Sequence, residues 1–357
     1  METSLLIIGY SLVLLLFVSL SLFLYIVLRR IIIKSMERNF NRKYQKIEKD
    51  ILGLITFPDR ELSAEIARRH QSHPEVLTKV LYDYIEQIEG QGKNELKKIF
   101  DYSLKIHYLK DIYSRRLIKR LRATHLFVVF SEPSETVHIV RLLNDKPLVR
   151  LVAVQALSRI RSPHALSYIF QAFEKDSNPN ARAYINIMFG LGTKIEYLVR
   201  TYLRKPLSLE KLGLLIELVG AIPLRFLYQD IIFFAHHPDK EIRTKVARAL
   251  GKMLIPDSYE ILSQLSRDDS WIVRAQAVKS LGYLKDLRAL DILTDALFSP
   301  FWHVRYNAGY SLASLGLPGI KRLRAVSQQK EDPYASDMAI MVMDEIVYSE
   351  GRDWVRL

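Results

Sequence analysis

The chain has 357 residues, of which 49% are apolar and 25% are charged, and its formal net charge is +13. This composition is typical of a folded protein, and the absence of cysteine excludes disulfides, thiolate catalysis, iron–sulfur clusters and cysteine-ligated zinc. The positive charge is concentrated in residues 29–49 and 93–125, a distribution that suits an anionic membrane surface better than a nucleic-acid groove.

Residues 5–28 are apolar and uncharged, and they predict a transmembrane helix after a short extracytoplasmic N-terminus, residues 1–4. A helix of this length reaches roughly 36 Å at about 1.5 Å per residue, which spans a hydrocarbon core of about 30 Å. A cleaved signal peptide needs a basic start and a shorter apolar region. Glu2 is the only charged side chain before this segment, so a membrane span is favoured.

Basic residues follow the apolar segment and predict its orientation. By the positive-inside rule, the N-terminus lies outside and the long C-terminal part lies in the cytoplasm. We expect the following side chains to contact the membrane surface: Arg29, Arg30, Lys34, Arg38, Arg42 and Lys43.

Residues 29–57 predict a basic helical stalk that continues the membrane helix until Pro58 ends it. Apolar residues recur every three or four positions from Ile33 to Leu54 and form one narrow stripe. Two interpretations remain open. The stripe pairs with a partner or with a second copy through the span or stalk, or the helix folds back on the next domain.

Residues 58–114 predict the helical N-terminal part of the cytoplasmic domain. From residue 93 to 122, basic residues alternate with aromatics, namely Phe100, Tyr102, Tyr108 and Tyr113. This mixture is found where proteins bind nucleic acid or lipid headgroups. Aromatics at helical spacing are more often core residues, and we favour that interpretation over nucleic-acid binding.

Residues 115–345 contain a repeat of about 31 residues, followed by a tail, residues 346–357. Arg243, Arg274 and Arg305 recur at this one constant interval. Each follows Ile or Val and precedes a small residue and Leu, as in Ala249-Leu250. Every repeat has two apolar-periodic stretches separated by Pro, Gly or Asp, which predicts a helical hairpin. Stacked hairpins bury a continuous core, so the fold class is all-α, a solenoid.

The aspartate shortly before a Val-Arg or Ile-Arg pair, and the Ala-Leu-Gly-like centre, resemble the HEAT-repeat family. The likeness is in particular to its short bacterial form, which phycobilisome lyases share. The resemblance implies a structural Asp/Arg ladder between repeats, formed by Asp145, Arg150, Arg182, Asp239, Arg243, Asp269, Arg274 and Arg305. The repeat from Leu207 to His236 lacks the arginine, which predicts an interruption of the ladder with a bend or a partner contact.

The sequence offers no constellation for chemistry. His70 and His73, and the pair His236 and His237, lack a third metal ligand at motif spacing. Gly190 and Gly192 are too few for a phosphate loop. We therefore predict no metal, no cofactor, no catalytic residue and no enzyme activity.

The candidate partner-binding residues are Trp271, Phe301, Trp302 and His303. Trp271 and Trp302 occupy the same position in successive repeats, so we expect them side by side. Tryptophan is enriched in the residues that dominate protein interfaces. The alternative is that the rings pack on each other and on the preceding loop.

Together these features predict a non-enzymatic, membrane-anchored scaffold or accessory subunit. Bacterial chains that look similar, with one span followed by HEAT repeats, suggest an integral membrane enzyme as partner, for example a polysaccharide-forming glycosyltransferase in the bacterial cytoplasmic (inner) membrane. Two alternatives remain: a chromophore or small-molecule lyase or sensor of the HEAT-like lyase type, and a nucleic-acid or anionic-lipid binding module.

Overall fold

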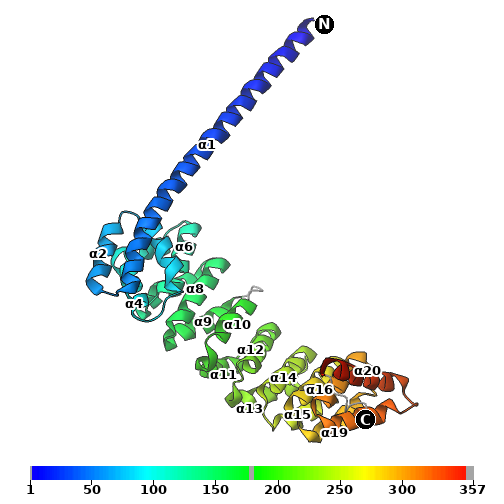
Figure 1. Ribbon diagram of the computed structural model, residues 1–357. Helices are drawn as coiled ribbons and strands as arrows, with labels where there is room; N and C mark the ends of the chain where they lie inside the picture. Colours follow the sequence, from blue (N-terminus) through cyan, green and yellow to red (C-terminus); the bar gives the residue numbers. More distant parts are fainter. Residues whose placement is uncertain (1, 177–180, 351–357) are drawn as a thin grey trace. The chain divides into compact units, whose positions relative to one another are not determined.

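The computed structural model describes residues 2–176 and 181–350, with side chains described for residues 15–176 and 182–346. The described residues form α-helices and short 3₁₀ helices and contain no strand. The chain divides into two compact units, residues 1–139 and residues 140–357. Figure 1 shows the helices of both units in chain order.

The N-terminal unit is organised around α1 (Glu2–Thr56), one helix that contains both the apolar segment and the basic stalk. It ends just before Phe57-Pro58, because a residue that precedes proline disfavours helical geometry. The remaining helices of this unit are α2 (Arg60–His70), α3 (Pro74–Ile85), α4 (Gly90–Ser103), α5 (Lys105–Ile112), α6 (Leu117–Phe130), η1 (Pro133–Glu135) and α7 (Thr136–Arg141).

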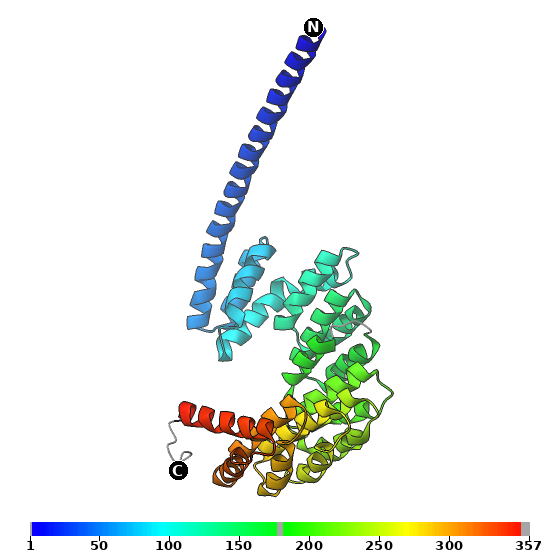
Figure 2. The same ribbon diagram turned by 90° about the vertical axis from the view of Figure 1, so that its right-hand side faces the viewer.

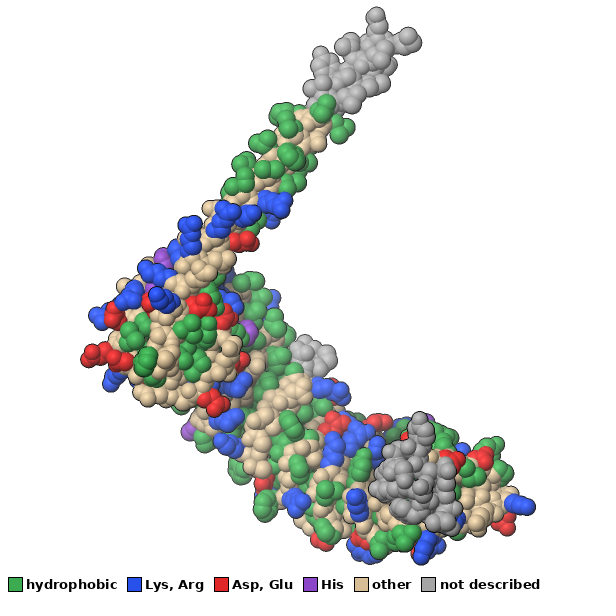
Figure 3. All heavy atoms as spheres, in the orientation of Figure 1, with side chains coloured by type: hydrophobic (Ala, Val, Ile, Leu, Met, Phe, Trp, Pro, Cys, Tyr) green, Lys and Arg blue, Asp and Glu red, His purple; other side chains and the backbone are tan. Residues whose placement is uncertain are grey.

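The described part of α1 contains a window that is long and apolar enough to cross a membrane. None of that window is buried against the rest of the chain. A signal sequence near an N-terminus passes the same test of length and composition, so this finding alone is weak support for a span. The apolar side chains of this region are exposed and precede the basic residues of the stalk along the helix (Figure 3).

The stalk stripe has two different environments. Ile47, Ile51 and Leu54 are completely buried at the end of α1, which packs against α2, α3 and α4. Polar contacts secure the same end: Tyr44 donates to Asp83 at 2.9 Å. The upper members of the stripe, from Ile33 to Phe40, are exposed. The helix therefore folds onto its own domain over its last turns.

The basic and aromatic stretch of residues 93–122 lies in α4, α5 and α6. Phe100 and Tyr108 are core residues, whereas Tyr102 and Tyr113 are exposed. Many of its basic side chains are ion-paired: Lys97 with Glu132, Lys98 with Glu95, Lys105 with Glu135, Lys119 with Asp111, and Arg122 with Glu75. About half of the basic side chains in this stretch are therefore neutralised by carboxylates of the same unit.

The C-terminal unit is a stack of helical hairpins in two layers, which Figure 2 shows from a second direction. The helices of the first layer pack side by side: α8 (Pro147–Ile160), α10 (Ala181–Phe189), α12 (Leu209–Ala221), α14 (Lys240–Met253), α16 (Trp271–Leu284) and α18 (Trp302–Ser314). The second layer contains α9 (Pro163–Lys175), α11 (Glu196–Leu203), α13 (Tyr228–Ile232), α15 (Ser258–Leu265), α17 (Leu290–Ala296) and α19 (Leu317–Ser327). The last helix, α20 (Pro333–Glu350), packs on α18 and α19.

Short 3₁₀ helices complete the connections within this unit. They are η2 (Leu142–Asn144), η3 (Gly192–Ile195), η4 (Arg225–Leu227), η5 (Phe233–His236) and η6 (Leu287–Ala289). Each hairpin therefore turns between its two layers through a tight 3₁₀ segment or a short loop.

Glycines let adjacent helices of the first layer approach closely. A Cβ atom added at Gly251 would lie 2.5 Å from Ser280 Oγ, and one added at Gly220 would lie 2.6 Å from the Ala249 Cα. Gly282 faces Ser311 in the same way. The Ala-Leu-Gly-like centre of the repeat thus has a packing function: each glycine accepts the small residue of the next repeat.

The divergent repeat at residues 207–236 keeps its place in the stack. Leu212 stands one repeat length before Arg243, so the arginine of the ladder is missing, as predicted. α12 packs against both α10 and α14, so the row of first-layer helices continues through this repeat, and the bend or partner contact stays a prediction. The close contact between Gly220 and Ala249 is kept in this repeat, as in the repeats that have the arginine.

Candidate functional site

Four repeat arginines bind the loops through which the chain enters the first-layer helices, namely Arg150, Arg243, Arg274 and Arg305. We call this set of contacts the seam, and Arg243 shows its geometry best. Its Nε and Nη2 donate to the two carboxylate oxygens of Asp268 at 2.7 and 2.8 Å. Its Nη1 donates to the backbone carbonyls of His237 and Pro238 at 2.8 and 2.9 Å. Such a planar, bidentate pair is among the strongest hydrogen-bonding arrangements in proteins. Arg243 therefore joins α14 to the loop that precedes α16.

The charges of this pair stabilise each other. Burial alone would raise the pKa of Asp268, but the hydrogen bonds from Arg243 and from the Ser270 N–H outweigh it and hold that pKa below its usual value. The hydrogen bond to Asp268 raises the pKa of Arg243. Both groups are therefore held in their charged forms at neutral pH.

Two further repeat arginines bind carbonyls in the loops before their helices. Arg274 Nη1 donates to the carbonyls of Asp268 and Asp269 at 2.7 and 3.0 Å. Arg305 is buried, and its Nη1 donates to the Ser299 carbonyl at 2.7 Å.

Arg150 combines both types of partner. Its Nη2 donates to the Asp145 carbonyl at 3.0 Å, and its Nη1 pairs with Asp176 Oδ1 at 3.0 Å. Tyr184 donates to the other oxygen of Asp176. The repeat arginines thus join each helix to its entry loop.

The carboxylates differ from those that the sequence predicted. The paired aspartates are Asp268 and Asp176, whereas the predicted Asp239 accepts hydrogen bonds from the Glu241 and Ile242 N–H groups of its own helix. Asp145 likewise accepts from the next N–H group, and Asp269 contributes its carbonyl. An aspartate just before a helix preferentially caps it, because the first N–H groups of a helix have no partner within it.

Arg182 does not belong to the seam. The seam arginines Arg150, Arg243, Arg274 and Arg305 are each the fourth residue of their helix, and each binds the loop before it. Arg182 is exposed and lines a hollow on the other side of the first layer. Tyr184 takes the structural position instead and binds Asp176.

The predicted tryptophans lie at the start of α16 and α18, but His303 lies between them. The ring centroid of His303 lies 5.2 Å from Trp271 and 5.1 Å from Trp302. Trp271 also stacks on Phe301, with centroids 5.7 Å apart. On α18, the ring centroid of Trp302 lies 4.8 Å from that of Tyr306, and the centroid of Tyr306 lies 4.5 Å from that of Tyr310. We call these six side chains the aromatic row: Trp271, Phe301, Trp302, His303, Tyr306 and Tyr310.

The aromatic row is partly packed and partly open. Trp302 is 48% exposed and Phe301 39%, and His303 is also exposed. Trp271 is half-buried beneath the stacked ring of Phe301, which also receives the Arg274 guanidinium at 5.3 Å. The two indole rings are thus separated by His303, Trp271 packs on Phe301 of the following loop, and Trp302 is exposed, so partner binding stays a prediction. Tyr306 and Tyr310 were missed, although their spacing of four residues from Trp302 indicates one helical face.

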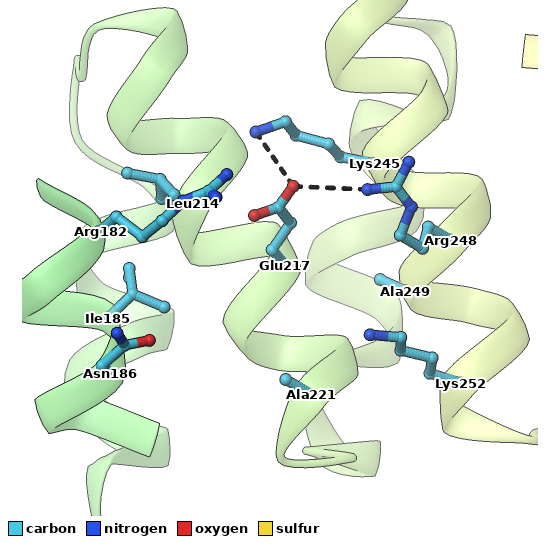
Figure 4. A pocket seen from close by; sticks show the side chains of 10 residues that line it. All are labelled: Arg182, Ile185, Asn186, Leu214, Glu217, Ala221, Lys245, Arg248, Ala249 and Lys252. Atoms are coloured by element: carbon cyan, nitrogen blue, oxygen red, sulfur yellow. Dashed lines mark ion pairs between the residues drawn. The ribbon is translucent and has the colours of Figure 1, made fainter. Parts of the chain in front are cut away.

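A basic hollow of about 350 Å³ lies across α10, α12 and α14 (Figure 4). Its charged lining residues are Arg182, Glu217, Lys245, Arg248 and Lys252. Glu217 Oε1 lies 3.3 Å from Lys245 Nζ and 3.7 Å from Arg248 Nη1. The single carboxylate is thus shared by two cations, and the hollow retains an excess of positive charge.

The basic hollow and the aromatic row are on the same side of the first layer. Glu217, Arg248, Lys279 and Tyr310 succeed one another at intervals of one repeat length on α12, α14, α16 and α18. Successive members of such a series occupy equivalent positions on adjacent repeats. We call this exposed side the open face. The side chains on this face are mainly basic on α14 and mainly aromatic on α18.

The predicted membrane-surface residues of the stalk lie on α1. Arg29, Arg30, Lys34, Arg38 and Arg42 are exposed, and Lys43 is half-buried. Among the described side chains, none of these six takes part in an ion pair. The other sequence candidates are structural: His70 Nε2 lies 2.8 Å from Asp50, and His237 Nδ1 accepts from the Asp239 N–H at 3.0 Å. The described residues contain no group of three or more metal-binding side chains.

Residues 258–344 match the protein family described as HEAT repeats. Among solved structures, the chain is similar to Kap121p bound to Ste12p, with 11% identity and a TM-score of 0.51, over 85% of this chain and 41% of Kap121p. It is also similar to the complex of CpcE and CpcF of phycocyanin lyase from Nostoc sp. PCC7120, with 16% identity and a TM-score of 0.32, over 68% of this chain and 94% of that chain. No curated protein sequence matches the chain. The likeness to Kap121p, at 11% identity, supports the fold alone.

Proposed function

Taking a HEAT-repeat solenoid as the premise, we propose that this protein is a non-enzymatic, membrane-anchored scaffold that binds a protein partner through its open face. The observation that carries the proposal is the exposed aromatic row. Trp302 presents nearly half of its surface to solvent beside Phe301 and His303. Exposed aromatics held by packing are the residue type that dominates protein interfaces, because they bury a large area at little entropic cost.

The lining of the basic hollow suits a segment of a protein partner. Four basic side chains and one carboxylate line it beside the apolar side chains of Ile185, Leu214, Ala221 and Ala249. Kap121p, whose fold is similar at a TM-score of 0.51, is bound to the protein Ste12p, which supports protein binding as a use of this fold.

The second part of the proposal is the anchor. The exposed apolar part of α1 would cross the cytoplasmic membrane with the N-terminus outside, and the basic stalk would contact anionic headgroups. A tethered scaffold has a high effective concentration for partners in the same membrane. We therefore propose an integral membrane enzyme as partner, and a polysaccharide-forming glycosyltransferase of a bacterial inner membrane as its class, which follows from the resemblance alone.

Photocrosslinking in the native membrane tests the partner. A benzoylphenylalanine replaces Tyr306 in the aromatic row, and the matched control replaces Tyr197, which is exposed on the second layer. We expect crosslinks to an integral membrane protein from position 306 only, and their loss when Trp302→Ala is added. Equal crosslinking from both positions, or crosslinks only to soluble proteins, would contradict the proposal.

Single-cysteine labelling tests the topology, because the native chain has no cysteine. Thr3→Cys precedes the apolar segment, and Lys330→Cys is exposed at the far end of the repeats. An impermeant maleimide added to intact spheroplasts should label position 3 at once and position 330 only after lysis. The reverse pattern would invert the orientation, and release of the protein by a carbonate wash would remove the anchor.

A further inference from the structure

We propose that the basic hollow binds an acidic segment of the protein partner, with carboxylates at Arg182, Arg248 and Lys252 and apolar side chains of the same segment on the aromatic row. This inference rests on the proposed function and specifies the chemistry of the partner. It is carried by the unbalanced charge of the hollow and by the position of the aromatic row on the same face.

The charge in the hollow is not balanced within the chain. Four basic side chains line it together with one carboxylate, Glu217. In the described part of the structure, no ion pair involves Arg182 or Lys252, and Lys279 on the next repeat is likewise exposed. Cations held close together repel one another, and an arriving anion relieves that repulsion.

On the second layer, several surface arginines are paired with carboxylates of the same chain. These pairs join Arg200 and Arg204 to Asp230, Arg288 to Asp286, and Arg322 to Asp291. Each of these arginines has a carboxylate within 3.1 Å. These four arginines are thus paired within the chain, whereas Arg182 and Lys252 of the hollow take part in no ion pair among the described residues.

The hollow is also held in shape. The aliphatic part of Lys245 lies over Gly213, where an added Cβ would be 2.7 Å from Lys245 Cδ. Glu217 pairs with the ends of Lys245 and Arg248, as the dashed lines in Figure 4 show, and it offsets part of their charge until an acidic ligand arrives.

An acidic peptide fits both parts of this face. Aromatic rings beside cations also bind nucleic-acid bases, and basic pockets also bind lipid headgroups, so the competition below tests a nucleic acid and a polyphosphate against the peptide. A peptide can alternate acidic and apolar residues to match the change in character from α14 to α18.

Fluorescence anisotropy with the full chain in a non-ionic detergent tests the inference. The probe is a fluorescein-labelled, glutamate-rich peptide with a leucine at every fourth position, and its lysine-for-glutamate version is the negative probe. The variant R182Q/R248Q/K252Q removes three exposed charges. If each exposed contact contributes about 0.5 kcal/mol, affinity for the acidic probe should fall about tenfold.

Two further variants separate the hollow from general surface charge. K321Q/K330Q removes two exposed cations from the second-layer end of the same unit and should leave the affinity unchanged. E217Q removes the only carboxylate of the hollow and should tighten binding of the acidic probe. Equal losses in the hollow variant and the control, or unchanged binding in both, would overturn the inference.

Competition identifies the class of ligand. If inorganic polyphosphate or a DNA oligonucleotide binds more tightly than the acidic peptide and is lost in the hollow variant, a nucleic-acid or phosphate site replaces the inference. Failure of the acidic probe leaves the crosslinking result at position 306 unaffected, so the two proposals fail independently. Binding of the probe without any crosslinked membrane protein would support the hollow and contradict the scaffold.

Discussion

The seam and the open face use arginine in two different ways, and α14 contributes one arginine to each. Arg243 faces the seam, where its side chain is 16% exposed and its guanidinium binds Asp268 and two carbonyls. Arg248 faces the open face, where its side chain is 46% exposed and lies 3.7 Å from Glu217. Arg243 is therefore a structural side chain, and Arg248, on the same helix, is accessible to a ligand.

The difference follows from burial. A hydrogen bond to a charged group gains strength where water is excluded, and removing one partner leaves the other uncompensated. An exposed pair contributes little because solvent screens it. We therefore expect the seam to determine the stability of the stack and the open face to determine what it binds.

The largest expected effect is the loss of Arg243. Arg243→Ala leaves Asp268 without its bidentate partner and should lower the local free energy of opening of α14 and α16 by about 2–4 kcal/mol. Hydrogen exchange by mass spectrometry on the full chain is the measurement, because repeat stacks open locally rather than all at once.

The matched variant for this comparison is Arg248→Ala on the same helix. It should change the same free energy by less than about 0.5 kcal/mol, as is usual for exposed substitutions. If both variants destabilise α14 equally, the division between seam and open face is wrong.

A smaller effect is expected at the glycine contacts of the first layer. Gly251→Ala improves helix propensity by about 1 kcal/mol, but overpacking against Ser280 typically costs about 1–3 kcal/mol. The net result should be a loss of roughly 1 kcal/mol, measured as faster exchange of α14 and α16.

Gly53→Ala is the control for propensity, since Gly53 is also helical and an added Cβ meets nothing within 4 Å. It should stabilise the end of α1 by up to about 1 kcal/mol. If both glycine variants stabilise their helices, adjacent repeats have more space than the close approach of Gly251 to Ser280 indicates.

Much of the fold could be predicted from the sequence because its signals are local. The constant repeat interval gives the hairpins, and the arginine at the fourth position of α8, α14, α16 and α18 gives the seam. The choice of Asp268 over Asp269 could not be predicted, because the loop backbone decides which of two adjacent carboxylates turns inward. Arg182 fits the spacing of the other repeat arginines, and only the structure shows that its side chain is exposed in the basic hollow while Tyr184 binds Asp176.

The candidate site could be predicted only in part. Trp271 and Trp302 were recognisable from their equivalent repeat positions, but the His303 ring between them depends on how the helix starts are packed. The basic hollow has no local signal at all. Its members come from α10, α12 and α14, and nothing in the spacing of Arg182 to Glu217 indicates that they share one hollow.

The smallest expected effect is the dependence of stability on pH at the seam. The folded state holds the pKa of Asp268 below its usual value, because the hydrogen bonds from Arg243 and Ser270 outweigh burial. Its contribution to stability is therefore complete above the unfolded pKa of about 3.9, and it is lost as the pH falls through the folded pKa. Asp268→Asn should lower the urea midpoint of the helical signal at neutral pH, and the gap to the native chain should close on acidification, where Asp268 is also neutral. Arg243 stays charged throughout, so it adds nothing to this dependence. Other carboxylates titrate equally in both proteins, so the difference between their urea midpoints isolates Asp268. A difference that stays constant or widens in acid would show that the seam does not hold this carboxylate.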